Sequence, residues 1–303
     1  MKKIICIGEC SLNVVVDQSG KPLGSMPGGR VLNAAAILAR DKFEVLMASD
    51  ASADPVGDIV AGYLERSGVN ISSVDRFTEG HTPLNVFVPS PDDPAELSVT
   101  RYEKYPDDCF DIVWPLVEKG DIVLFGGHYA LDERMRQRLV RFLRYCQERD
   151  AVLVYLPGFM PVQEPRITRV MPALLENLEM ANVVVARNID LKLIFGIDNT
   201  DTAYHNHIDF YCRSLVSVDV ACHRISYYTG KEMSTVDIPA GICRTMMWNS
   251  GAVAGVVASI MEQNLTADDL EHPSASAREA ILGAAARQAA LTAKDLDTSW
   301  QMI

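Results

Sequence analysis

The chain has 303 residues, 48% of them hydrophobic, which is enough to bury the core of one large α/β domain. Its 28 lysines and arginines against 40 aspartates and glutamates give a net charge of −12 without any basic run, which argues against nucleic acid and anionic membranes as partners. Seven cysteines without a CxxC spacing, no secretory leader and no long apolar stretch predict a cytoplasmic protein with reduced thiols.

Apolar, strand-like runs alternate along the chain with amphipathic helical runs, a pattern typical of a parallel sheet covered by helices on both faces. The predicted strands are residues 4–8, 44–48, 122–125, 152–156, 183–186 and 218–223. The predicted helices are residues 32–40, 56–67, 131–149, 167–178, 189–195, 204–215 and 249–260. Residues 12–17 and 81–102 interrupt the alternation and predict additional β-structure beside the sheet.

A glycine pair, Gly28 and Gly29, precedes the first predicted helix and places Asn33 one turn into it. Glycine lets the backbone approach a ligand closely, and the asparagine amide offers both a donor and an acceptor to a hydroxyl-rich molecule. Alone, such a pair is more often a tight turn; its spacing from Asn33 favours a ligand site. Arg30 and Val31 replace the Lys-Ser/Thr of a P-loop, and no GxGxxG follows a strand, which excludes those two nucleotide motifs.

These features resemble the first half of the PfkB (ribokinase-like) carbohydrate kinases, because the glycine pair is followed by Asp54-Pro55-Val56-Gly57 and Gly68-Val69-Asn70. With the late helix, the resemblance covers nearly the whole chain. It implies a single three-layer α/β/α domain over residues 1–303, with a mostly parallel central sheet. It also implies a small β-lid, inserted at about residues 11–27 and 80–108, that covers the sugar.

The sugar-binding half of the family pattern is retained. The resemblance implies a pocket for a small hydroxylated molecule, such as a sugar, polyol or nucleoside, around Asn13, Gly28, Gly29 and Asn33. Asn13 stands where the family usually has a sugar-binding aspartate. A polar lid residue without a ligand role is the alternative for Asn13. Similarly, His128 follows a glycine pair at a strand end, where ligands gather in α/β sheets, although a structural role is the simpler interpretation.

The phosphate-binding half departs from the family pattern. The family enters the late helix through Asp-Thr-Thr/Val-Gly-Ala-Gly-Asp, in which the last aspartate is the general base. Anchored on Ala254 and Gly255, the base position is Ser250, flanked by Asn249 and Gly251, and the upstream residues Met247 and Trp248 are expected to fill the loop. The family's Gly-x-x-Gly falls on residues 221–224, which contain no glycine.

A further family motif, the Asn-x-x-Glu that organises metal and phosphate, corresponds to Asn188 with a displaced carboxylate at Asp190. The resemblance implies ATP and Mg²⁺ as cofactors, but a serine hydroxyl is not basic at neutral pH and has no visible activator here. Phosphoryl transfer needs a base and positioned donors around the phosphate. All the departures therefore affect this one step, and no set of metal ligands can be assigned.

We predict a binding or regulatory relative of the sugar kinases that keeps the sugar pocket and has lost efficient phosphoryl transfer. One alternative is an active ATP-dependent carbohydrate kinase in which Asp190, Asp237 or another carboxylate serves as the base. A second alternative is a structural subunit that pairs with an active kinase. The predicted lid strands leave an open edge, and such edges are usually paired, so we also expect a homodimer through the lid.

Overall fold

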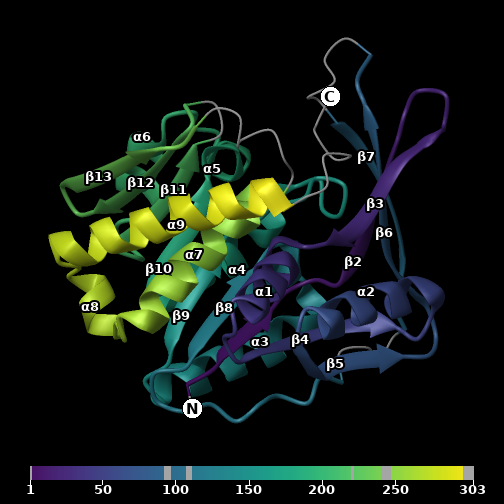
Figure 1. Ribbon diagram of the computed structural model, residues 1–303, viewed down its shortest axis with the longest axis horizontal. Coiled ribbons are helices and arrows are strands. Elements are labelled where there is room, and N and C mark those ends of the chain that lie inside the picture. The colour runs from purple at the N-terminus through teal and green to yellow at the C-terminus, as the bar shows by residue number, and fades with distance from the viewer. Residues whose placement is uncertain (1, 92–96, 107–110, 220–221, 240–246, 296–303) are drawn as a thin grey trace.

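The protein was analysed as a computed structural model, which describes residues 2–91, 97–106, 111–219, 222–239 and 247–295 (Figure 1). The main sheet has nine strands, in spatial order β13 (Glu232–Asp237), β12 (Arg224–Thr229), β11 (Ser214–Asp219), β10 (Val183–Arg187), β9 (Val152–Leu156), β8 (Ile122–Gly126), β1 (Ile4–Ile7), β4 (Val45–Ser52) and β5 (Asn70–Phe77). A second sheet, the lid sheet, has the order β3 (Pro22–Gly28), β2 (Ser11–Val16), β6 (His81–Pro89) and β7 (Leu97–Lys104).

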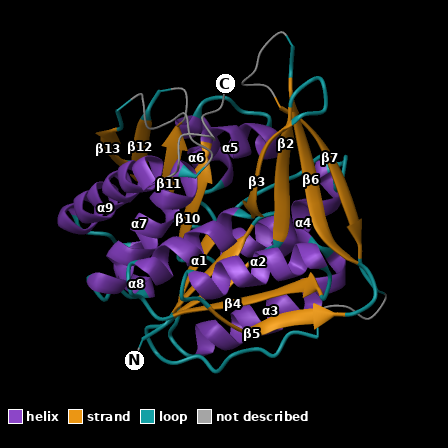
Figure 2. Cartoon of the chain, turned by 45° about the vertical axis from the view of Figure 1, so that its right-hand side comes forward, coloured by secondary structure: helices purple, strands orange, loops and turns teal. Residues whose placement is uncertain are grey.

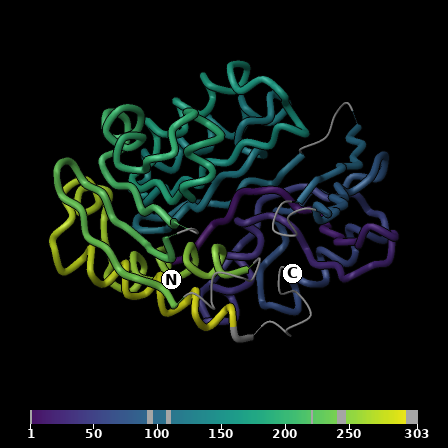
Figure 3. The backbone as a smooth tube through the Cα atoms, turned by 90° about the horizontal axis from the view of Figure 1, so that it is seen from above, coloured from purple at the N-terminus to yellow at the C-terminus, as the bar shows by residue number. Residues whose placement is uncertain are grey.

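Helices cover both faces of the main sheet (Figure 3). One layer consists of α1 (Arg30–Arg40), α2 (Pro55–Arg66), α7 (Trp248–Glu262), α8 (Ala267–Glu271) and α9 (Ala275–Asp295). The other consists of η1 (His128–Leu131), α3 (Glu133–Glu148), α4 (Ile167–Met180), α5 (Asn188–Phe195) and α6 (Thr200–His207). The strands from β11 to β5 are parallel, and only β12 and β13 run antiparallel to their neighbours. This arrangement confirms the predicted three-layer ribokinase-like fold.

The short strand β1 shows why the sequence specifies this architecture. All four of its residues are buried, and alternate side chains point to opposite faces of a strand. Ile4 and Cys6 belong to the core shared with α1, α7 and α9, whereas Ile5 and Ile7 belong to the core shared with α3 and α4. A strand that is apolar on both faces is expected wherever helices cover both sides of the sheet.

One pair of predicted elements was wrong. The helix predicted at residues 204–215 ends at His207, and the strand predicted at 218–223 is β11, which begins at Ser214 and ends at Asp219. The Tyr204 hydroxyl stabilises the turn between them, because it contacts the Asp209 carboxylate at 2.8 Å and the Arg213 carbonyl at 2.7 Å. These contacts hold residues 208–213 out of a helix despite their helix-like apolar spacing.

The lid sheet stands beside the β4–β5 end of the main sheet (Figure 2). Its two halves come from separate chain segments, which meet where β2 pairs in parallel with β6. Among the described helices, none is both long enough and apolar enough to cross a membrane. Five cysteines in the described ranges are free thiols: Cys6, Cys10, Cys146 and Cys212, which are buried, and Cys222, which is exposed.

Candidate functional site

A pocket of about 240 Å³ lies where the lid sheet faces the main sheet. Its lining comes from residues that follow β1, β8 and β9, from the end of β10 and the start of α5, from the start of α1, and from lid strands β2 and β6. Parallel strands all end at the same edge of their sheet, and open α/β sheets bind ligands at that carboxyl edge. The position of the pocket therefore agrees with that of a ligand site.

A row of three polar side chains crosses the lid sheet above the pocket. Asn13 in β2 is paired in register with Asn85 in β6, which is paired with Arg101 in β7. The Asn85 Nδ2 donates to Asn13 Oδ1 at 2.9 Å, and the Arg101 Nη1 donates to Asn85 Oδ1 at 3.0 Å. These bonds fix the amide groups of Asn13 and Asn85, both of which line the pocket, and amide groups can donate to and accept from a hydroxyl group.

Glu9, which follows β1, anchors this row to the main sheet. Its carboxylate forms an ion pair with Arg101, whose side chain is only 2% exposed. A second contact joins Arg101 Nη1 to Glu9 Oε2 at 3.3 Å. Burial alone would lower the pKa of Arg101, but Glu9 and Glu103 outweigh burial and raise it. The Glu9 carboxylate is thus held by a permanent cation.

The glycine pair shapes the turn between the lid and α1. Gly29 has a φ of 104°, which favours glycine, and a Cβ there would lie 2.5 Å from the Glu9 carbonyl oxygen. A Cβ on Gly28 would lie 2.5 Å from Ser11 Oγ and 2.6 Å from Asn13 Oδ1. Gly29 lines the pocket, whereas Gly28 does not and instead makes room for two side chains that do.

Asn33, predicted to contact the ligand, lies outside the pocket lining. It is 6% exposed in α1, and its Nδ2 donates a long hydrogen bond of 3.4 Å to the Pro27 carbonyl. Its Oδ1 is buried without a hydrogen-bond partner among the described residues. The structure therefore places Asn33 behind the turn that carries the glycine pair, and not at the pocket surface.

Two arginines and one carboxylate form the opposite end of the pocket. Asp190, in the first turn of α5, accepts from Arg30 Nη1 at 2.7 Å and from Arg187 at 2.6 Å (Nη2) and 2.9 Å (Nε). Burial raises the pKa of Asp190, but Arg187 and Arg30 overcome this effect and lower it to about 2. A carboxylate with so low a pKa is a weak base, which bears on its predicted role as a substitute catalytic base.

A further ionisable residue, His128, lies at the start of η1. It lines the pocket, and its Nδ1 is buried without a hydrogen-bond partner among the described residues. Burial lowers the pKa of His128, so its imidazole is neutral at physiological pH. Its ring can therefore donate one hydrogen bond and accept another.

The residues at the predicted phosphate site do not line this pocket. Asn249, Ser250 and Gly251 lie in the first turn of α7, where Ser250 is 2% exposed and a Cβ on Gly251 would lie 2.6 Å from Thr292 Oγ1. Met247 and Trp248 are buried, and the loop that they are predicted to fill lies mostly outside the described residues. Residues 221 and 244–246 of the motif comparison lie outside the described residues.

Asn188 also lies outside the pocket lining. Its Nδ2 contacts the Asp219 carboxylate at 3.3 Å, at the end of β11. The two side chains that share the first turn of α5 at a spacing of three residues are Arg187 and Asp190. Asp190, predicted as the displaced carboxylate of this motif, is therefore held by Arg187, and Asn188 is hydrogen-bonded to Asp219.

Sequence reasoning missed most of the charged residues at the site. In the sequence, Arg30 is notable only because it breaks the P-loop pattern, and Glu9 only because it follows the first predicted strand. Asn85 and Arg101 carried a signal, because a polar residue on the inward face of a lid strand needs a partner. The sequence alone does not show which side chains face inward, because that depends on the pairing register of β2, β6 and β7.

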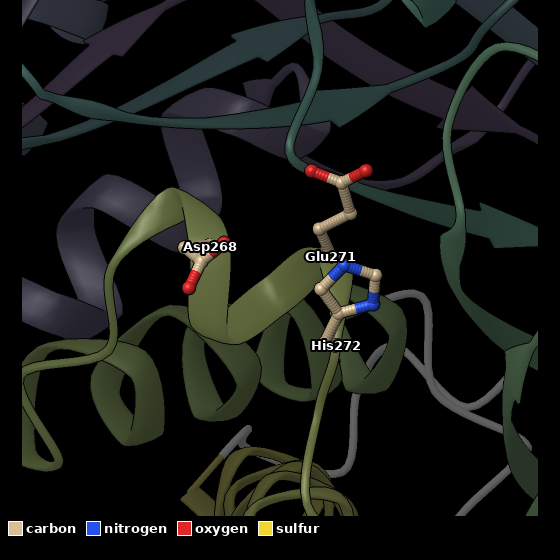
Figure 4. Close-up of side chains that lie close together, drawn as sticks. All are labelled: Asp268, Glu271 and His272. Carbon is tan, nitrogen blue, oxygen red and sulfur yellow. The ribbon is translucent and has the colours of Figure 1, made fainter.

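A second group of potential metal ligands lies away from this pocket, on and just after α8. Asp268, Glu271 and His272 each offer a ligand atom within 4.8 Å of the others (Figure 4). All three are exposed, and α8 has only five residues. Exposed acidic groups are common on helices at this spacing, so we assign no site to them.

The family model described as pfkB family carbohydrate kinase matches residues 1–208. No curated protein sequence matches the chain. A crystal structure of aminoimidazole riboside kinase from Salmonella enterica, complexed with aminoimidazole riboside and an ATP analogue, superposes with a TM-score of 0.78 at 13% identity, covering 100% of this chain and 97% of that one.

Two fructokinases are similarly close in structure. The apo enzyme from Vibrio cholerae O395 gives a TM-score of 0.77 at 16% identity, covering 98% of this chain and 100% of that chain. The ATP-bound enzyme from Xylella fastidiosa gives 0.74 at 18% identity, covering 98% and 95%. At these identities the likeness establishes the shared fold alone.

Proposed function

Because this chain belongs to the pfkB family of carbohydrate kinases, we propose that it binds a small hydroxylated molecule under the lid and has lost efficient phosphoryl transfer. A sugar, polyol or nucleoside is the class of ligand that suits the pocket. The observation that carries the proposal is that both carboxylates of the described pocket lining, Glu9 and Asp190, are held by arginines. Neither is available to take a proton from a hydroxyl group.

The binding half of the proposal is supported by the polar row. Asn13, Asn85 and Ser11 present fixed amide and hydroxyl groups within a pocket of about 240 Å³. This volume is just below the roughly 300–1,000 Å³ of sites for drug-sized ligands, so it suits a monosaccharide-sized molecule. Similarly, the solved relatives named above include a complex with a riboside.

Two observations argue against a working site for Mg²⁺ and the phosphates of ATP. Both oxygens of Asp190 already accept hydrogen bonds from arginines, which compete with a metal cation for this carboxylate. At the start of α7, Ser250 replaces the base and Gly251 is packed against Thr292. Residues 240–246, which lie outside the described ranges, contain no aspartate or glutamate. The other candidate base, Asp237, is exposed on β13 and paired with Arg224 at 2.9 Å.

A panel of sugars, polyols and nucleosides, screened by thermal shift and calorimetry, tests the binding half. A ligand at 100 times its Kd should stabilise the protein by about 2.7 kcal/mol. Asn13→Ala and Asn85→Ala should remove this stabilisation, whereas Asn206→Ala, at an exposed position in α6, should keep it. If no hydroxylated compound shifts the melting temperature, the proposed pocket is wrong.

ATP turnover with the same panel tests the catalytic half. Loss of a general base alone typically slows a reaction by about 10²–10⁴-fold, so activity should be at or near background. A turnover number of roughly 1–100 per second, the ordinary range for kinases, would instead support the alternative of an active kinase.

We further propose that two copies pair through the lid sheet and that the protein works in the cytoplasm. The edge strands of the lid sheet are β3 and β7, and Tyr102 on β7 is 60% exposed. The free cysteines fit a reducing compartment. Light scattering should report a dimer that Tyr102→Glu dissociates, and a monomer across the micromolar range would contradict this assembly.

A further inference from the structure

The cluster of Arg30, Arg187 and Asp190 brings together two separate parts of the chain. Arg30 is the first residue of α1, directly after the glycine pair, and Arg187 and Asp190 belong to the start of α5. Arg30 also donates to the Pro157 carbonyl at 2.7 Å, which fixes its guanidinium group beside the pocket. All three residues line the pocket.

The cluster carries one positive charge more than its carboxylate can balance. Both oxygens of Asp190 already accept hydrogen bonds from the arginines, and its side chain is 3% exposed. The side chains of Arg30 and Arg187 are 22% and 27% exposed, so they can meet a ligand. Within the described chain, Arg187 Nη1 has no hydrogen-bond partner, and each guanidinium group retains further free N–H donors.

Asp190 balances the positive charge of Arg187 better than it balances that of Arg30. Burial opposes the charge of Arg187, but Asp190 overcomes it and raises the pKa of Arg187. For Arg30, burial prevails over Asp190, and its pKa is lowered. A partly buried cation whose charge is not fully compensated is destabilising unless a counter-charge is bound. The surplus charge therefore favours an anion on the open side of the pair.

We propose, building on the proposed function, that the ligand of this pocket is a hydroxylated molecule with an oxyanion at one end, held by Arg30 and Arg187. A guanidinium group can donate two parallel hydrogen bonds to two oxygens of the same carboxylate or phosphate group. The hydroxyl groups at the other end lie against Asn13 and Asn85. Sugar acids and sugar phosphates are the two sources of this chemistry.

Matched pairs of compounds test the proposal on the full-length protein by calorimetry. D-Gluconate is compared with D-glucitol, and glucose 6-phosphate with glucose, so that each pair differs mainly in the charged group. We expect one anion to bind on the order of 10-fold or more tightly than its neutral partner, since a hydrogen bond to a charged group contributes about that much. The two pairs show whether a carboxylate or a phosphate is preferred.

Variants then test whether the arginines cause the preference for the anion over its neutral partner. Arg30→Gln should remove most of it, and Arg30→Lys should restore part of it. Arg30→Gln leaves the capping interaction of Arg187 with Asp190 intact and thus carries the test even if Arg187→Gln impairs folding. Arg224→Gln, which removes an equal charge from an exposed pair on β12, should leave the preference unchanged.

Several outcomes would overturn the proposal. If the neutral compounds bind as tightly as the anions, the pocket binds hydroxylated ligands but the charge has no role, and the proposed function survives. If none of these four compounds binds, this proposal fails, whereas the proposed function fails only if the whole panel of sugars, polyols and nucleosides also fails to bind. Binding of ADP that Arg30→Gln abolishes, without binding of either sugar anion, would assign the arginines to a nucleotide instead.

Discussion

Glu9 at the end of β1 and Arg101 in lid strand β7 form a buried ion pair that joins the lid sheet to the main sheet. The contact links an edge strand of the lid sheet, β7, to the end of an interior strand of the main sheet, β1. Arg101 has one other carboxylate neighbour, Glu103, at 2.8 Å. The geometry of the polar row thus depends on an interaction between the two sheets.

Replacing Glu9 by alanine should destabilise the whole domain. The change leaves the buried guanidinium group of Arg101 with Glu103 alone. Breaking a buried pair costs about 3–5 kcal/mol, and because Glu103 remains we expect a loss of about 2–3 kcal/mol in urea unfolding. Asp237→Ala, which breaks the exposed pair with Arg224, is the control and should cost less than about 1 kcal/mol. Equal losses would show that the Glu9–Arg101 pair has no special role.

Replacing Gly29 by alanine should destabilise the protein through a steric clash in addition to backbone strain. Gly20 provides the matched control, because its φ of 83° is also positive but no atom lies within 4 Å of a Cβ built there. Positive φ costs a non-glycine residue roughly 1 kcal/mol, and the contact of 2.5 Å with the Glu9 carbonyl adds to this for Gly29 alone. Unfolding curves in which Gly29→Ala loses no more stability than Gly20→Ala would contradict the close approach.

The stability of the protein should fall as pH rises through the titration of Asp50, a buried residue of β4. Burial raises the pKa of Asp50 to about 7, which the Tyr129 hydroxyl and Arg134 oppose and Glu9 and Asp132 reinforce. In the unfolded chain an aspartate titrates near pH ~3.9. Between about pH 4 and about pH 7 the folded state therefore binds the extra proton, and stability declines with pH in this window.

The measurement is urea unfolding across that pH range for wild type and Asp50→Asn. In Asp50→Asn the free energy of unfolding should fall less between about pH 4 and about pH 7, because its amide does not titrate. Asp268→Asn, at an exposed position on α8, controls for removing a carboxylate and should keep the wild-type slope. Parallel curves for wild type and Asp50→Asn would mean that Asp50 is charged in the folded state.

Restoring the family's carboxylate through Ser250→Asp should not restore kinase activity. Ser250 is buried in the first turn of α7 and does not line the pocket, so an aspartate there would not reach a bound hydroxyl group. Even the combined change Met247→Gly, Asn249→Gly, Ser250→Asp should give little activity. Nucleotide binding by calorimetry with Mg²⁺ present completes the test. A large rate gain from Ser250→Asp, or low micromolar binding of ATP by wild type, would indicate an intact phosphate site.

The fold could be predicted from the sequence because apolar residues recur at a different spacing in its strands than in its helices. Strands such as β1 and β9 are short apolar runs, and helices such as α1 begin at recognisable turns. The error near Tyr204 has a tertiary cause: its hydroxyl bonds to the Arg213 carbonyl and accepts from the Gly230 amide. Such contacts between distant residues cannot be inferred from local spacing.

The candidate site was predicted less completely than the fold. Asn13 and Gly29 line the pocket, but Asn33 does not, because the turn at the glycine pair places it behind the pocket wall. The charged residues depend on contacts between distant segments, such as that of Arg30 with Asp190, which is 160 positions away. A single sequence offers no means of pairing them.

The interior position of β1, between β8 and β4, has a consequence for the synthesis of this protein. Ile4 is paired with Val45 on one side and with Ile122 on the other, so β1 is made long before its second partner. Until β8 leaves the ribosome, the backbone N–H and C=O groups along one edge of β1 have no strand partner. Open edges recruit other chains, and long-range parallel pairing is slow. We expect the yield of folded protein to depend on chaperones that shield this edge during translation.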